Sequence, residues 1–225
     1  YFFNAHLLET YQTHLLDNGL RIIHLPLKSA VAYCGVIVNA GSRDEAVKEH
    51  GMAHFIEHML FKGTRKRRSV QIINRLEDVG GELNAYTSKE ETVVYAGFLK
   101  EYTPRAIELI ADLVQNSTFP EKEAEKELLV IQAEIQSYND SPSELIFDDF
   151  EAMIFDGNAI GHSVLGDEQD LNGFTPDMAK RFFGRYYQPG NMVFFYVGDI
   201  DFTKLINRVR DSFIFANDSV LNHER

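Results

Sequence analysis

The chain has 225 residues, of which 44% are hydrophobic and 25% charged, so it has the composition of a globular protein with a sizeable core. Its formal net charge of −12 argues against nucleic acid as a partner, because phosphate binding needs a basic surface. The one basic cluster, Arg65-Lys66-Arg67-Arg68, is short and is expected to be a solvated turn. No apolar run is long enough to span a membrane and no targeting segment is visible, which predicts a soluble protein. Because the first residue is Tyr1 and not Met, we expect a fragment or a mature form.

Strand and helix patterns follow one another along the chain. Asp17-Asn18-Gly19 predicts a tight turn between two antiparallel strands at 11–16 and 20–25. The apolar run 31–40 predicts a strand buried on both faces, with Cys34 as a buried residue and not a nucleophile. Further strands are predicted at 82–87, 91–99 and 191–198, and helices at 48–61, 69–79, 103–114, 121–138, 143–155, 175–183 and 201–213. With no internal repeat or linker, we expect one α+β domain over residues 1–225.

The stretch 50–61, HGMAHFIEHMLF, contains the pattern H-x-x-E-H. On a helix, residues four apart lie on the same face one turn above each other, so His54 and His58 can converge on one metal ion. Glu57 lies beside them. Two neutral imidazoles suit Zn²⁺, and an open fourth position would hold a water whose pKa the metal lowers. The alternative is an ordinary amphipathic helix that carries two histidines. Because ligand histidines must be neutral, we expect zinc occupancy to fall below about pH 6.

Two carboxylates in the predicted helix 121–138 differ from the other acidic residues there. Glu127 and Glu134 lie seven residues apart, two turns on one face, with Ile131 between them. Carboxylates on a partly apolar stripe are candidates for burial, and buried carboxylates need a metal or another cation. The alternative is two solvated glutamates. His162, alone in a predicted loop, is expected to be a surface residue.

The strand 82–87 carries few bulky apolar residues. Such a strand is suited to the edge of a sheet, where free backbone groups can pair with an extended peptide. An ordinary hairpin is the alternative interpretation.

Taken with Glu134, the H-x-x-E-H pattern resembles the inverzincin zinc peptidases, the family of pitrilysin, insulin-degrading enzyme and mitochondrial processing peptidase. The likeness extends over nearly the whole chain and includes the segments 41–45, 80–87, 127–135, 187–192 and 197–199. It implies a mixed, mainly antiparallel sheet covered by helices, as in the catalytic half of that family. It also implies one Zn²⁺ per chain on His54, His58 and Glu134.

The resemblance assigns further roles. Glu127 matches a carboxylate that supports a zinc ligand, and Phe61 matches a residue beside the scissile bond. Asn84, Ala85 and Tyr86 match the edge strand that pairs with substrate. Family members consist of two similar halves or subunits, so this chain is expected to be the first half, with a second homologous half as its partner.

These observations lead to the hypothesis of a zinc endopeptidase that hydrolyses extended or unfolded peptides, with Glu57 as the general base. The alternative from another class is a non-catalytic partner or scaffold subunit of the same fold. Relatives of that kind tend to lose the metal residues, whereas this chain keeps them. A purely structural zinc fits poorly, because structural sites usually have four protein ligands and only three are evident here.

Overall fold

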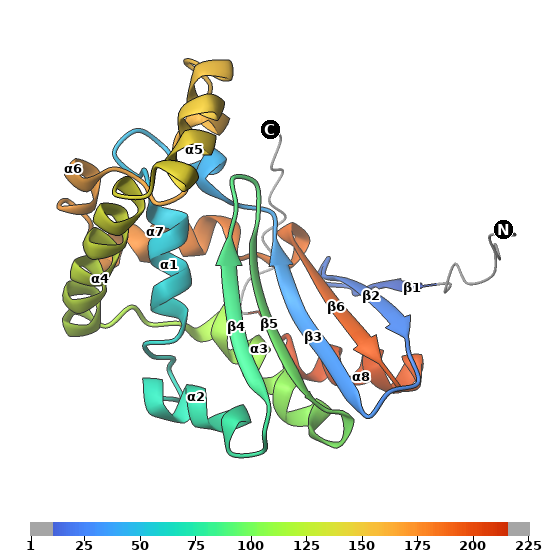
Figure 1. Ribbon diagram of the computed structural model, residues 1–225. Helices are drawn as coiled ribbons and strands as arrows, with labels where there is room; N and C mark the ends of the chain where they lie inside the picture. The colour runs from blue at the N-terminus through green and yellow to red at the C-terminus, as the bar shows by residue number, and fades with distance from the viewer. Residues whose placement is uncertain (1–10, 216–225) are drawn as a thin grey trace, which may run out of the picture.

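The computed structural model describes residues 11–215 of the chain (Figure 1). In this part of the chain, one mixed sheet has the strand order β1-β2-β6-β3-β5-β4. Only β2 and β6 pair in parallel, and the other neighbouring strands are antiparallel. The strands are β1 (Gln12–Leu15), β2 (Arg21–Pro26), β3 (Val31–Val38), β4 (Glu82–Thr87), β5 (Thr92–Leu99) and β6 (Met192–Gly198). The predicted α+β class with a mainly antiparallel sheet is confirmed.

The helices gather on one side of the sheet and at one of its edges. Figure 1 shows α3 and α8 behind the sheet, and α1 and α4 beside the edge formed by β4. The α-helices described are α1 (Met52–Leu60), α2 (Ser69–Glu77), α3 (Thr103–Asn116), α4 (Glu121–Asn139), α5 (Pro142–Ile154), the single turn α6 (Glu168–Leu171), α7 (Pro176–Tyr186) and α8 (Phe202–Ser212). Short 3₁₀ turns are η1 (Ser42–Asp44), η2 (Lys100–Tyr102), η3 (Ala159–Gly161) and η4 (Pro189–Asn191).

Capping side chains explain where several helices begin. The side chains of Thr175 and Asp201 accept hydrogen bonds from the backbone N–H groups of Met178 and Lys204, as N-caps do. Both starts were predicted from the sequence. The first hairpin is also confirmed: β1 pairs with β2, and Gly19 adopts a φ of 88° in the turn between them.

The core lies between the sheet and the helices behind it. Alternate residues of β6 point into it, and they meet apolar side chains from α1, α3 and α8. Cys34 is fully buried in β3, as predicted. The prediction that this strand is buried on both faces is wrong for its first half, because Val31 and Tyr33 are 40% and 45% exposed. Their side chains lie on the sheet face that no helix of residues 11–215 covers (Figure 1).

The basic cluster is also more structured than predicted. Arg67 donates hydrogen bonds to both carboxylate oxygens of Glu108, at 2.7 and 2.8 Å, and pairs with the buried Asp112. One member of the cluster therefore anchors the turn to α3, and the other three are exposed, as predicted. No helix among residues 11–215 is both long and apolar enough to cross a bilayer.

Candidate metal centre

The helix that carries the H-x-x-E-H pattern is shorter than predicted. It begins at Met52 and not near Lys48, because Gly51 has a φ of 95° and directs the chain away from the helix axis. The carboxylate of Glu45, which is buried, accepts the N–H groups of Gly51 and Ala53 at 2.9 Å each. A carboxylate from outside the helix thus satisfies two of the backbone donors that a helix start leaves unpaired.

The imidazoles of His54 and His58 face the same carboxylate on α4. Oε2 of Glu134 lies 3.8 Å from Nε2 of His54 and 3.6 Å from Nε2 of His58. Tetrahedral zinc with bonds of about 2.05 Å needs ligand atoms roughly 3.3 Å apart. The two distances to Glu134 exceed this spacing by roughly 0.5 and 0.3 Å, and all three donor atoms lie within 4.8 Å of one another. The donor set and the spacing therefore fit zinc.

The protonation of His54 also suits a metal ligand. Burial, reinforced by the neighbouring His58, lowers the pKa of His54 to about 4. The imidazole is therefore neutral at neutral pH, and its approach to Glu134 is not an ion pair. Nδ1 of His54 is buried without a hydrogen-bond partner among residues 11–215.

Glu127 lies behind the second histidine. Its Oε2 is 3.2 Å from Nδ1 of His58, and its Oε1 pairs with Nζ of Lys62 at 2.6 Å. Such a contact orients an imidazole so that its other nitrogen points at the ion. The predicted burial holds for Glu127, which is 7% exposed, but is wrong for Glu134, whose side chain is 46% exposed. Glu134 borders solvent near the end of α4, so the site opens on that side.

The carboxylate of Glu57 points to the strand β4. Its Oε2 accepts a hydrogen bond of 2.7 Å from the hydroxyl of Thr87. Burial raises the pKa of Glu57, and the hydrogen bond from Thr87 and the proximity of His58 offset part of that rise. A carboxylate with a raised pKa is a better proton acceptor near neutral pH.

β4 forms the edge of the sheet, as its composition predicted. Ala85 and Thr87 point to the helical side of the sheet, and Asn84 and Tyr86 are on the exposed side. The N–H of Ala85 is occupied by the side-chain oxygen of Asn84 at 2.8 Å, so it is not used by β5. Phe61 follows the last residue of α1 and packs, half-buried, against the core.

Sequence reasoning missed several residues around this centre. His162 was expected at the surface, but its Nε2 lies 3.6 Å from Oε2 of Glu45 and its ring stacks on His50 with centroids 4.3 Å apart. The pKa of His162 is raised, first by its hydrogen bond to Glu45. Glu45, His162 and Thr87 act through tertiary contacts, and only the position of an acidic residue shortly before a helix hinted at Glu45.

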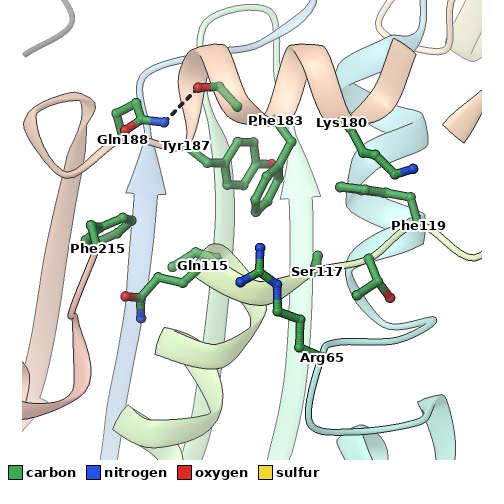
Figure 2. Close-up of a pocket in the computed structure, with 12 residues that line it drawn as sticks. Arg65, Gln115, Ser117, Phe119, Lys180, Phe183, Tyr187, Gln188 and Phe215 are labelled. Carbon is green, nitrogen blue, oxygen red and sulfur yellow. Dashed lines mark hydrogen bonds between the residues drawn. The ribbon is translucent and has the colours of Figure 1, made fainter. Parts of the chain in front are cut away.

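A separate cavity of about 520 Å³ lies between α3 and α7 and is lined by none of the predicted site residues (Figure 2). Arg65, Phe183 and Tyr187 are among its lining residues. Tyr187 stacks on Phe183 with ring centroids 4.3 Å apart. Burial, followed by the charge of Glu57, raises the pKa of the Tyr187 phenol, so this residue lies between the cavity and the predicted base.

Several known proteins are similar to this chain in sequence or structure. Residues 23–168 match the family model of insulinase (peptidase family M16), and residues 173–215 match the peptidase M16 inactive domain. An uncharacterized zinc protease of Rickettsia felis is 36% identical over 88% of this chain and 48% of its own length. The mitochondrial-processing peptidase subunit beta of Dictyostelium discoideum is 35% identical over 88% of this chain and 42% of its own length.

The fold has close counterparts among solved structures. A protease from Helicobacter pylori matches with a TM-score of 0.90 and 25% identity, over 96% of this chain and 54% of that one. The chain thus spans about half the length of the relatives it matches. The family match over most of the chain, together with the convergence of two histidines and a glutamate, leads to one conclusion: the chain belongs to peptidase family M16, the insulinase family.

Proposed function

We propose that this chain is the zinc-binding catalytic half of an endopeptidase that hydrolyses extended or unfolded peptides. The observation that carries the proposal is the convergence of His54, His58 and Glu134, whose donor atoms lie within 4.8 Å of one another. Relatives named as zinc proteases support the choice of metal. One zinc ion per chain follows from the single such cluster among residues 11–215.

The residues of the chain have distinct tasks in the proposed reaction. Zinc, when bound to the two histidines and Glu134, supplies a Lewis acid that polarises the peptide carbonyl and acidifies a water molecule. Glu57 takes the proton of the attacking water and passes it to the leaving amine. Glu127 keeps the ring of His58 in orientation, because it contacts Nδ1 and leaves Nε2 to the metal.

The substrate is proposed to bind as an additional strand on β4. An edge strand has backbone donors and acceptors that a peptide in extended conformation can use. The N–H of Ala85 is one of them, and the Asn84 side chain that now occupies it would move to the peptide or to solvent. Phe61 and Tyr86 are proposed to contact substrate side chains.

The remainder of the protein is proposed to be a second, homologous half. The chain covers only 48% and 42% of the two relatives described above. Residues 173–215 match a family model that is called the peptidase M16 inactive domain. The non-catalytic alternative therefore remains open for the test that follows, which measures zinc and cleavage separately.

Replacing Glu57 with Gln tests the proposal. The amide keeps the shape of the side chain but cannot accept the proton, so cleavage of an unfolded protein such as labelled casein should fall by at least ~1000-fold. Zinc content should stay at one ion per chain, as measured by atomic emission after dialysis. The comparison uses the full-length protein. Retained cleavage in the Gln variant would remove Glu57 from the mechanism, and a wild-type protein without zinc would favour the scaffold alternative.

A further inference from the structure

Thr87 is the residue that holds the carboxylate of Glu57. Its hydroxyl donates to Oε2 at 2.7 Å, and no other residue of the described part of the chain donates a hydrogen bond to this carboxylate or forms an ion pair with it. One oxygen of Glu57 is therefore fixed, and the other has no hydrogen-bond partner among residues 11–215. A base in a hydrolytic site needs this arrangement, because the free oxygen must face the water.

The chemical nature of this partner matters. A lysine or arginine would fix Glu57 equally well but would strongly favour its charged form and so weaken it as a base. A neutral hydroxyl also orients the carboxylate, but it lowers the pKa of Glu57 less than a positive charge would. The neighbouring Tyr187 adds no charge beside Glu57, since burial and the charge of Glu57 raise the pKa of its phenol and keep it neutral.

The backbone around Thr87 is held in place. Thr87 is the last residue of β4 and lies opposite Thr92 in the sheet. The turn that follows is closed by the hydrogen bond from the N–H of Ser88 to the carbonyl of Glu91 at 2.8 Å. The β-branched threonine side chain has few rotamers on a strand, so its hydroxyl has a defined direction.

The same turn is tied to the segment that begins α1. The N–H groups of Ser42 and Arg43 donate to the carbonyls of Ser88 and Lys89 at 3.2 and 2.8 Å. Gly41 lies so close to this turn that a Cβ atom would collide with the backbone oxygen of Ser88. Glu45, whose carboxylate caps α1, is the residue directly after η1. The strand end with Thr87 and the helix with Glu57 are thus fixed to one short segment, 41–45.

We propose that Thr87 is a positioning residue for the general base, and that it links the edge strand on which the peptide is expected to bind to the carboxylate that acts on the water. The proposal rests on the proposed function, because it assumes that Glu57 is the base. A peptide that pairs with β4 would be held by the same strand that, through Thr87, holds the carboxylate of Glu57. The strand would then fix both the register of the peptide and the position of the base.

Thr87→Val keeps the shape of the side chain and removes the donor. In the zinc-loaded full-length protein, kcat for labelled casein should fall by ~10- to 100-fold, since a displaced base costs about that much. KM should change less than about twofold, because the side chain of Thr87 faces the helices and not the expected peptide. Thr87→Ser, which retains the hydroxyl, should recover kcat to within about fivefold. Thr13→Val, at the exposed opposite edge strand β1, is the matched control and should match the wild type.

A second measurement does not depend on activity. In crystals of the zinc-free protein, Glu57 should occupy one rotamer in the wild type and in Thr87→Ser, and several in Thr87→Val. An unchanged kcat in Thr87→Val, an equal loss in the Val and Ser variants, or a fixed Glu57 in the Val variant would overturn the proposal. The proposed function fails separately, and the positioning role with it, if the wild type does not cleave or if Glu57→Gln cleaves as fast as the wild type.

Discussion

At the scale of single residues, the fold keeps His54, one of the proposed metal ligands, neutral. His54 is 7% exposed, and its pKa of about 4 lies well below the ordinary value of 6.5. The folded protein therefore disfavours the protonated imidazole, whereas the unfolded chain accepts the proton readily. The same burial that costs stability in acid removes competition between protons and zinc at this nitrogen.

This difference predicts an acid-sensitive apoprotein. Since the folded pKa of His54 is lowered from 6.5 to about 4, stability is lost as the pH falls through that window. Between pH 7.5 and pH 5, the loss attributable to His54 should be about 2 kcal/mol. Urea unfolding in the presence of a chelator measures it, as the difference in pH dependence between the wild type and His54→Gln.

The comparison between variants is needed because other groups titrate in the opposite direction. The pKa values of Glu45 and Glu57 are raised by burial, so their contributions to stability grow as the pH falls. Both groups are present in the wild type and in the variant, and their effects cancel in the difference. Equal pH dependence of the two proteins would show that His54 is not held neutral by the fold.

At the scale of elements, α1 owes its position to a residue outside it. Glu45 satisfies the first N–H groups of the helix, and burial raises its pKa to about 7. The helix itself offers no side-chain cap, since Gly51 stands at the N-cap position. The imidazole of His162 lies on the other side of Glu45, so the loop after α5 also contacts this cap.

Removing the carboxylate of Glu45 should destabilise the start of α1. Glu45→Ala leaves two buried N–H groups unpaired and should lower the free energy of unfolding by about 2–4 kcal/mol. Glu45→Gln keeps an acceptor oxygen and should cost about half as much, because a neutral side chain is partly tolerated at a site where the carboxyl pKa is near 7. Urea unfolding of the zinc-free protein gives both values.

The control is Glu77→Ala, at an exposed position of α2, which should change the free energy of unfolding by less than about 0.5 kcal/mol. A loss no larger in Glu45→Ala than in this control would contradict the role.

The sequence was informative about elements and less so about their contacts. The H-x-x-E-H spacing placed His54 and His58 on one face of a helix, because helical periodicity is local. The start of the helix was predicted four residues too early, since the turn at Gly51 depends on Glu45 folding back onto it. Thr87 and His162 were missed for the same reason: each acts on a residue that is near only after folding. The spacing of Glu127, Ile131 and Glu134 along the helix could not show that Glu134 is exposed. Its exposure depends on where α4 ends relative to α1.

At the scale of the whole molecule, all the proposed site residues belong to this chain, but the proposed centre is open to solvent. The three proposed zinc ligands, the proposed base and the edge strand lie within residues 11–215. The side chain of Glu134 is nevertheless 46% exposed, and Tyr86 on the edge strand is equally so. A site that excludes water strengthens the electrostatic interactions on which hydrolysis depends. The second homologous half proposed above, which would correspond to the remaining half of the relatives' length, is our candidate for that cover.

The proposed zinc ligands lie in this chain, whereas the proposed cover of the site lies in the second half. Metal binding and turnover should therefore depend on different parts of the protein. The present chain alone should bind zinc within about threefold of the affinity of the full-length protein, because every proposed ligand is in it. Its kcat/KM for an unfolded protein should be lower by at least ~100-fold, because water and the peptide are not enclosed. Adding the remaining half as a separate polypeptide should restore turnover in a saturable manner. Isothermal titration with zinc and a casein cleavage assay measure the two quantities on the same samples. If the chain alone turned over as fast as the full-length protein, the second half would have no role in catalysis, and the exposure of Glu134 would be a property of the working enzyme.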